Sequence, residues 1–202
     1  MKLLLELFKG SGSVGTIARK KGFDTLSLDF DEEFEPDILT DILKWDYKKM
    51  NIRPEFIWAS PPCNTYSSLA YPLRERDPKT AEPLSERAVI GTKILYKTIE
   101  IIKYFLKKNP NMGFVIENPR GMMRYDKKIK EFIYNFTYYC NYNDDRTKPT
   151  NFFSNYPLYL DPTICRGPKS AHIENIPLIE RYKIPPELTA HIIDVFLKLK
   201  KV

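Results

Sequence analysis

Short apolar runs alternate along the first part of the chain with stretches of helical periodicity. The runs have the length and composition of buried strands, and they lie at residues 3–8, 25–28, 56–59 and 113–116. Before the last run, apolar residues recur at three- and four-residue steps from Ser85, which can cap a helix, to Pro110, which ends it. A shorter helix is predicted after the glycines that follow the first run.

The pattern continues less regularly beyond residue 120. A helix is predicted over 127–136, followed by strands at 137–142 and 151–154 that are joined by a polar turn. Residues 155–184 are irregular and basic, with Arg166, Lys169 and His172. Pro185-Pro186 then opens a last helix, whose apolar stripe is Leu188, Ile192, Val195, Phe196 and Leu199. We expect His191 to lie at the surface, off that stripe.

The length allows one domain, and the composition indicates partners only weakly. A chain of 202 residues can bury a core, and its net charge of +6 weakly favours a polyanionic partner. Cys63, Cys140 and Cys165 are widely spaced without metal-binding companions, so we expect neither a disulfide scaffold nor structural zinc. Apolar runs are too short for a membrane span, and Glu6 interrupts any signal-peptide core. We therefore expect a reducing, intracellular compartment.

The first strand ends in a glycine-rich turn with the spacing Gly10-x-Gly12-x-x-Gly15. Glycines let backbone N–H groups approach a ligand, and the start of the following helix favours electron-rich groups. This spacing alone fits a nucleotide, a dinucleotide or only a tight turn.

An acid follows the second predicted strand. Asp29 has the position at which nucleotide-binding α/β folds place a carboxylate for ribose hydroxyls, and Phe30 could stack on an adenine. The alternative is a solvated acidic loop, because four more carboxylates follow closely: Asp31, Glu32, Glu33 and Glu35.

Two strand ends carry candidate chemistry. The third apolar run leads into Ser60-Pro61-Pro62-Cys63-Asn64, where the prolines fix the backbone and present the thiol. A lone cysteine is more often inert and buried, so this turn gains meaning only with its neighbours. The fourth run ends in Glu117-Asn118-Pro119, which places a carboxylate at a strand end as a candidate acid or base.

The stretch between Asn64 and Ser85 is a long polar loop. Its aromatic and basic residues would suit a lid over a nucleic-acid substrate, although a plain solvated loop fits nearly as well. Those residues are Tyr66, Tyr71, Arg74, Arg76 and Lys79.

The order of these motifs resembles the cytosine-C5 methyltransferases along most of the chain. Leu7-Phe8-Lys9-Gly10-Ser11-Gly12 resembles the cofactor motif of that family, and Ser60-Pro61-Pro62-Cys63-Asn64 resembles its Pro-Cys motif, with Asn where Gln is commoner. Glu117-Asn118 matches its Glu-Asn motif. Ser85-Glu86-Arg87 stands where the family has a Ser-Arg pair, and Ile184-Pro185-Pro186 resembles its closing segment.

The resemblance implies a Rossmann-like α/β fold with a mostly parallel seven-stranded sheet and S-adenosylmethionine as methyl donor. The implied product is S-adenosylhomocysteine, and no metal is implied. The implied cofactor residues are Phe8, Gly10, Gly12, Val14, Asp29, Phe30, Asp41, Ile42 and Pro61.

The resemblance also implies a reaction. The Cys63 thiolate would add to C6 of a flipped cytosine and raise electron density at C5, while Glu117 holds the N3 edge. An ordinary thiol is only a few per cent ionised at neutral pH. We therefore expect help from nearby cations, with Arg146 and Lys148 as the candidates. The candidates for substrate contact are Asn64, Arg87, Asn118 and Pro119.

Two departures limit the resemblance. The late basic motif of the family reads Gln-x-Arg-x-Arg, whereas this chain has Arg146-Thr147-Lys148-Pro149-Thr150. The family also inserts a large recognition domain where only about residues 155–184 are available, so we expect a single domain over 1–202 with a reduced recognition segment. This is typical of a small phage- or virus-like enzyme with a short recognition sequence.

Several readings of the partner stay open. We expect a monomer that acts on double-stranded DNA and does not bind membranes, in a prokaryotic or virus-infected cell. RNA, such as a tRNA cytosine, would use the same catalytic residues. An exocyclic-amino methyltransferase is disfavoured because Cys63 stands in the aromatic position of the Ser-Pro-Pro-aromatic motif. An inactive DNA-binding accessory protein is disfavoured by the presence of Cys63 and Glu117.

Overall fold

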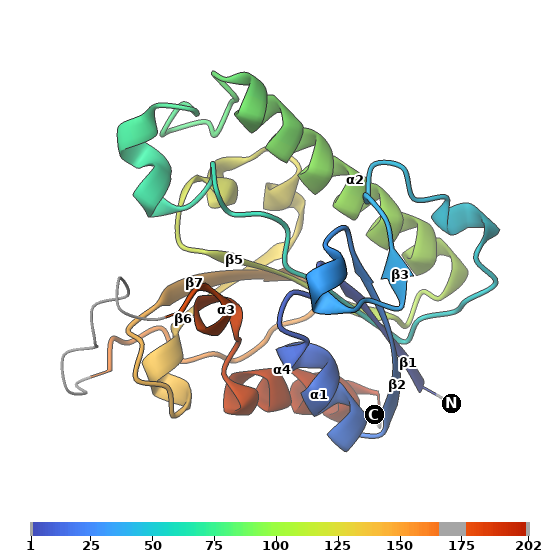
Figure 1. The fold of residues 1–202 in the computed structure, drawn as a ribbon. Coiled ribbons are helices and arrows are strands. Elements are labelled where there is room, and N and C mark those ends of the chain that lie inside the picture. Colours follow the sequence, from blue (N-terminus) through green and yellow to red (C-terminus); the bar gives the residue numbers. More distant parts are fainter. Residues whose placement is uncertain (1, 166–176, 201–202) are drawn as a thin grey trace.

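The fold is built on one central sheet. The computed structural model describes residues 2–165 and 177–200. Seven strands form a sheet in the order β3-β2-β1-β4-β5-β7-β6. Neighbouring strands from β3 to β5 are parallel, and β7 runs antiparallel to both β5 and β6. Helices cover both faces (Figure 1), so the prediction of a mostly parallel seven-stranded sheet flanked by helices is confirmed.

Strands and helices mostly alternate along the chain. The strands are β1 (Lys2–Leu7), β2 (Phe23–Asp29), β3 (Ile38–Leu39), β4 (Phe56–Ala59), β5 (Gly113–Pro119), β6 (Ile133–Tyr138) and β7 (Pro149–Ser154). The helices are α1 (Ser13–Lys20), α2 (Glu86–Lys108), α3 (Leu178–Tyr182) and α4 (Pro186–Leu199). Short 3₁₀ turns lie at 32–34, 47–49, 68–73, 122–125, 129–131 and 139–142.

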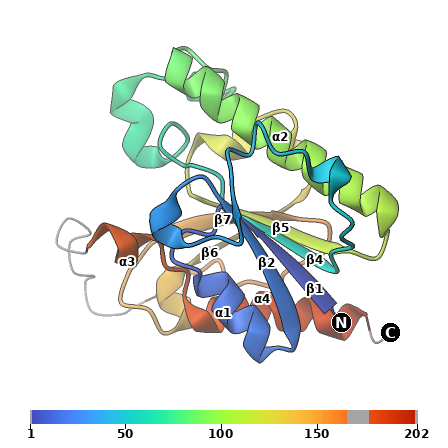
Figure 2. The ribbon, with the colours of Figure 1, turned by 45° about the vertical axis from the view of Figure 1, so that its right-hand side comes forward.

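Two hydrophobic cores lie on opposite faces of the sheet. Because successive strand residues point to opposite faces, Phe56 and Trp58 of β4 pack with α1 and α4, whereas Ile57 and Ala59 pack with α2. Figures 1 and 2 show α2 on one side of the sheet and α1 with α4 on the other. The central strands are buried on both faces, which explains their continuous apolar runs.

Helix α2 begins and ends where the sequence predicts. The Ser85 hydroxyl accepts a hydrogen bond from the Ala88 backbone N–H at 3.1 Å, and Lys107 and Lys108 occupy the last turn. Such caps satisfy backbone groups that the helix itself leaves unpaired.

The predicted helix over 127–136 is wrong. A single 3₁₀ turn ends at Glu131, and strand β6 starts at Ile133. The apolar spacing fits a helix, but Tyr134, Phe136 and Tyr138 alternate on one side of a strand that pairs with β7. Strand pairing therefore overrides the local pattern. The bounds of the strand predicted over 137–142 are also wrong, because β6 ends at Tyr138 and a 3₁₀ turn follows.

The expectation about the cysteines also needs correction. Cys140 and Cys165 form a disulfide with their Cα atoms 5.9 Å apart, and Cys63 is the free cysteine. Their sequence separation of 25 gave no hint of this contact. His191 is not simply a surface residue, because its Nε2 lies 2.9 Å from the Leu158 carbonyl oxygen and its ring contacts Tyr142.

The basic residues predicted in the irregular segment, Arg166, Lys169 and His172, lie outside the described residues. No helix within residues 2–165 and 177–200 is both long and apolar enough to cross a membrane. Over the same ranges, no group of three or more His, Cys, Asp or Glu side chains is placed to hold a metal ion.

Candidate active site

The parallel strands bring the three sequence motifs to one edge of the sheet. Leu7 of β1 pairs with Ala59 of β4, and Ala59 pairs with Ile116 of β5. The glycine turn, the Pro-Pro-Cys turn and Glu117 all follow these paired positions. Carboxyl ends of neighbouring parallel strands meet at one edge, which is where open α/β sheets bind ligands.

Hydrogen bonds fix the turn that carries Cys63. The Cys63 carbonyl oxygen accepts from the backbone N–H groups of Tyr66 and Ser67, both at 2.9 Å. The Asn118 side chain donates from Nδ2 to the Pro61 carbonyl oxygen at 2.9 Å. Asn118 is only 1% exposed, and its hydrogen bond joins the Glu-Asn motif to the Pro-Pro-Cys turn.

The segments that follow the two motifs are joined by their backbones. Ser68 N–H donates to the Arg120 carbonyl oxygen at 3.1 Å, and Met122 N–H donates to the Tyr66 carbonyl oxygen at 2.6 Å. Gly121 lies between these bonds, where a Cβ atom would stand 2.0 Å from the Tyr66 carbonyl oxygen. The close approach therefore requires glycine at 121.

Arg76 holds the loop after Cys63 against α2. Its guanidinium donates to Thr65 Oγ1 at 3.1 Å, to the Ala81 and Ala88 carbonyl oxygens at 3.0 and 2.6 Å, and to Thr92 Oγ1 at 2.9 Å. The guanidinium carbon also lies 3.6 Å from the centre of the Tyr66 ring. Arg76 is 2% exposed, so the loop at this point is neither a free lid nor a solvated loop.

Glu117 has a partner that the sequence did not single out. Tyr139 donates from its hydroxyl to Glu117 Oε1 at 3.3 Å, and both side chains are buried. Burial, followed by the charge of Glu117, raises the pKa of Tyr139 well above its usual range, so the phenol stays protonated and available as a donor. In the sequence, this role of Tyr139 is indicated only by its position shortly before the basic turn.

The free protein does not lower the pKa of Cys63. Burial raises the pKa of the thiol, Lys148 counteracts this as the second largest effect, and the Glu117 carboxylate raises it further. Lys148 and a backbone hydrogen bond act in the direction that we expected, but burial outweighs them.

The two cations of the basic turn are engaged differently. Arg146 donates to Asp144 Oδ1 at 2.7 Å and to the carbonyl oxygens of Glu180 and Lys183 at 2.6 and 2.9 Å. Its donors are thus used to hold α3 and the residue that follows it. Lys148 makes one long contact of 3.4 Å to the Arg181 carbonyl oxygen and lies 4.8 Å from the Tyr139 ring centre. We therefore retain Lys148, and not Arg146, as the candidate catalytic cation.

The remaining predicted substrate residues lie in different surroundings. Asn64 is exposed beside Cys63, and Pro119 is partly buried at the end of β5. Arg87 is exposed at the start of α2 and pairs with Glu75 through two hydrogen bonds of 2.9 and 2.7 Å.

The cofactor half of the predicted site is built on left-handed backbone. Phe8, Gly10 and Gly12 have φ values of 65°, 48° and 66°. No atom lies within 4 Å of where a Cβ would stand on Gly10, so the turn has open space above it. Asp29 accepts from Gly10 N–H at 3.0 Å and from Phe30 N–H at 2.8 Å, which ties the ends of β1 and β2 together.

The other predicted cofactor residues surround this turn. Phe30 is 70% exposed, unusually so for a large aromatic ring, whereas Val14 and Ile42 are buried. Asp41 Oδ1 accepts from Leu43 N–H at 2.9 Å, and Pro61 is buried beside the Cys63 turn. An open glycine turn next to an exposed aromatic ring fits a nucleoside-containing cofactor.

Glu6 is a buried carboxyl group near the site that no sequence motif indicated. It accepts from Gly15 N–H at 3.0 Å beneath the glycine turn. Burial raises its pKa to about 7, against the hydrogen bond from Gly15 and the charges of Lys9 and Arg19, which lower it. A Cβ on Gly15 would lie 2.7 Å from Glu6 Oε2, so this glycine is needed for the contact.

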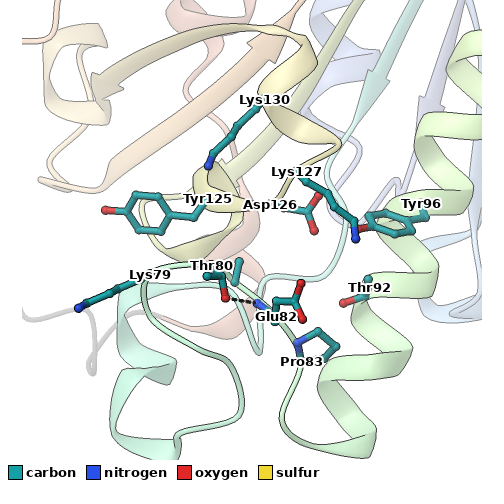
Figure 3. A pocket seen from close by; sticks show the side chains of 11 residues that line it. Lys79, Thr80, Glu82, Pro83, Thr92, Tyr96, Tyr125, Asp126, Lys127 and Lys130 are labelled. Carbon is teal, nitrogen blue, oxygen red and sulfur yellow. Dashed lines mark hydrogen bonds between the residues drawn. The ribbon is translucent and has the colours of Figure 1, made fainter.

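A pocket of about 400 Å³ lies away from these motifs (Figure 3). It is enclosed by the loop at 79–83, by Thr92 and Tyr96 of α2, and by the segment at 125–130. Lysines and carboxylates both line it, and none of the predicted site residues does. We assign it no role.

The seven-stranded, mostly parallel sheet is the one that the resemblance in sequence implies. No family model matches the chain. A probable DNA (cytosine-5)-methyltransferase of Frog virus 3 (isolate Goorha) is 30% identical over 188 residues, which span 89% of this chain and 83% of the viral protein. The chain therefore belongs to the cytosine-5 methyltransferase family.

Solved methyltransferases are more distant. The Entamoeba histolytica methyltransferase EhMeth and the DNMT2 of Spodoptera frugiperda are 12% and 16% identical, each with a TM-score of 0.49. The alignments cover 84% of this chain but only 58% and 56% of those two structures. The chain thus spans a little over half the length of these proteins.

Proposed function

We propose that the chain is a DNA (cytosine-5)-methyltransferase that uses Cys63 as its nucleophile. The observation that carries this proposal is the joining of the Pro-Pro-Cys turn to Glu117-Asn118 by the Asn118 side chain and by backbone bonds around Gly121. This arrangement holds a thiol and a carboxylate at one sheet edge, next to the glycine turn. The kinship with the viral protein supports the same reaction.

The glycine turn and its neighbours would hold S-adenosylmethionine. The open space above Gly10 can admit it, Phe30 offers an exposed face for an adenine, and Asp29 keeps lone pairs for ribose hydroxyls. Asp41 and Ile42 would lie at the edge of the adenine, with Pro61 nearby. Once bound, the cofactor supplies an electrophilic methyl group.

Cytosine C5 is a weak nucleophile, and the addition of Cys63 makes it a stronger one. Its thiolate forms a bond to C6, and the electron pair of the C5–C6 double bond moves toward C5. As C5 takes the methyl group, the sulfonium S–CH3 bond would break and S-adenosylhomocysteine would leave. Water would then accept the C5 proton as the thiolate departs and the double bond forms again. The target base must leave the duplex stack for this, at a cost of a few kcal/mol.

Three side chains would support the addition. Glu117 would hold the N3 edge of the cytosine, with its own position set by the Tyr139 hydroxyl. Lys148 stabilises the thiolate, since it acts to lower the pKa of Cys63. Water leaves the site when the base enters, which would strengthen the effect of Lys148.

We infer that sequence recognition uses little protein in this chain. In the described parts of 155–184, Leu158 packs in the core with α4, and Arg146 binds carbonyl oxygens of Glu180 and Lys183. We therefore infer a single catalytic domain with a short or relaxed target sequence.

The test is methyl transfer with nucleoside analysis. The protein is incubated with labelled S-adenosylmethionine and, separately, with cytosine-containing duplex DNA, single-stranded DNA and tRNA. We expect 5-methylcytosine in DNA. N4-methylcytosine or N6-methyladenine without 5-methylcytosine would overturn the proposal, and 5-methylcytosine only in tRNA would move the substrate to RNA.

A second test traps the nucleophile. A duplex with 5-fluorocytosine should form a covalent adduct with the wild-type protein and none with Cys63→Ala. The control is Cys140→Ala/Cys165→Ala, which keeps Cys63. An adduct that survives Cys63→Ala would remove Cys63 from the mechanism.

A further inference from the structure

A group of basic and aromatic side chains lies just beyond the end of β5 and along β6, on the α2 side of the sheet. Arg120 follows Pro119, the last residue of β5, and Arg124 and Tyr125 come from the turn at 122–125. Tyr134 and Phe136 lie on one side of β6, because alternate strand residues share a face. We call these five residues the β6 surface.

Among residues 2–165 and 177–200, no carboxylate pairs with either arginine of the β6 surface. In the described ranges, no ion pair or side-chain hydrogen bond engages Arg120, which is exposed and lies 5.2 Å over the Phe136 ring. Arg124 donates only to the Tyr125 hydroxyl, at 2.7 Å. By contrast, carboxylates neutralise Arg87 and Arg146. The charges of Arg120 and Arg124 thus remain available to an anion.

The aromatic side chains hold this surface in place and leave one ring open. Tyr134 donates to Asn151 Oδ1 at 3.0 Å and packs against Phe153, yet it is 50% exposed. Arg120 lies over Phe136, which shares one side of β6 with Tyr134. Burial raises the pKa of Tyr134, and the charges of Arg124 and Arg120 act in the opposite direction. A fixed, half-exposed ring beside two cations can stack a base while the cations bind phosphates.

We propose that the β6 surface binds the nucleic-acid strand that carries the target cytosine, with Arg120 and Arg124 on phosphates and Tyr134 against an unstacked base. This inference rests on the proposed function and adds the place where a strand next to the flipped base is held. The position fits, because Arg120 is three residues from Glu117 and its carbonyl oxygen is bonded to the segment after Cys63. It would add to the contacts made by residues 155–184, which we expect to be a reduced recognition segment.

The first test compares two charge removals. Arg120→Ala/Arg124→Ala is matched with Arg53→Ala/Lys107→Ala, which removes the same charge from the segment before β4 and from the last turn of α2. Binding of fluorescent single-stranded and duplex oligonucleotides is measured over a range of salt. We expect the first variant to bind single strands at least tenfold more weakly and to lose about 1.4 from the salt slope. The control should change less than twofold.

The second test isolates the ring of Tyr134. Tyr134→Phe removes only the hydroxyl that bonds Asn151, whereas Tyr134→Leu removes the aromatic face as well. Because stacking on an aromatic side chain contributes about 1–3 kcal/mol per base, Tyr134→Leu should bind single strands at least about fivefold more weakly than Tyr134→Phe. A similar affinity for the two variants would overturn the stacking role.

The outcomes separate this inference from the proposed function. If the wild type forms the 5-fluorocytosine adduct but Arg120→Ala/Arg124→Ala binds like its control, the β6 surface is overturned alone. If the β6 variants lose binding while the wild type transfers no methyl group, only the proposed function fails. Thermal melting checks the fold, and Arg120→Ala by itself, at an exposed position, keeps the test available if the double variant unfolds.

Discussion

The segment after Cys63 and the segment after Glu117 both carry arginines, but they use them in opposite ways. Arg76 is buried and makes four hydrogen bonds, whereas Arg120 is exposed and no described group bonds its guanidinium. A buried arginine with satisfied donors fixes backbone. An exposed one without a partner is left for a ligand. The difference separates positioning of the nucleophile from contact with the substrate.

Gly121→Ala should have the largest effect, because Gly121 joins the two segments. A Cβ atom 2.0 Å from the Tyr66 carbonyl oxygen must push the backbones apart. We expect a loss of about 3 kcal/mol in the free energy of unfolding, or roughly 10 °C in melting temperature, together with loss of adduct formation. Ser68→Ala, at an exposed neighbouring position, is the control. A stable, fully active Gly121→Ala would show that the close approach is not required.

Arg76→Lys sharpens the comparison between buried and exposed arginines. Lysine keeps the charge but cannot reproduce the forked hydrogen bonds or the stacking on Tyr66, so we expect a loss of about 2–3 kcal/mol in denaturant unfolding. Arg87→Lys, in an exposed pair with Glu75, should cost less than about 1 kcal/mol. Equal losses would contradict the anchoring role of Arg76.

Tyr139→Phe tests the support of Glu117. The variant loses the 3.3 Å hydrogen bond but keeps the buried ring, so we expect a small loss of about 1 kcal/mol in stability and about a tenfold slower single-turnover methylation. Cofactor affinity should stay the same, since Tyr139 lies on the substrate side. An unchanged rate would leave Tyr139 with a structural role only.

The ionisation of Cys63 gives the smallest effect. Burial raises the pKa of the thiol, so alkylation of the free protein by iodoacetamide should keep increasing with pH beyond the ordinary thiol range near pH 8.5. Lys148→Gln removes the charge that counteracts burial. In this variant the pKa of Cys63 should rise further, and the alkylation of Cys63 at pH 8 should slow several-fold. Faster alkylation of Lys148→Gln would reverse the assigned effect. Measurements without reductant keep the Cys140–Cys165 disulfide closed, so only Cys63 reacts.

Local patterns predicted the central part of the fold. The apolar runs that became β1, β4 and β5 are buried on both faces, and helix α2 carries its own cap and stop at Ser85 and Pro110. The edge of the sheet was different. The 127–136 segment has helix-like spacing, and only its pairing with β7 makes part of it a strand. Likewise, Cys140 and Cys165 meet only because the chain folds back after β7.

Neighbours along the chain are enough to predict the three motifs: a glycine turn, a thiol after two prolines and a carboxylate after a buried strand. The surroundings of these motifs depend on how distant parts of the chain pack together. Tyr139 reaches Glu117, Arg76 anchors the Cys63 loop, and Arg146 is used to hold the chain near Lys183. These contacts join residues that are distant in sequence, and no local pattern encodes which cation finds a partner and which stays free.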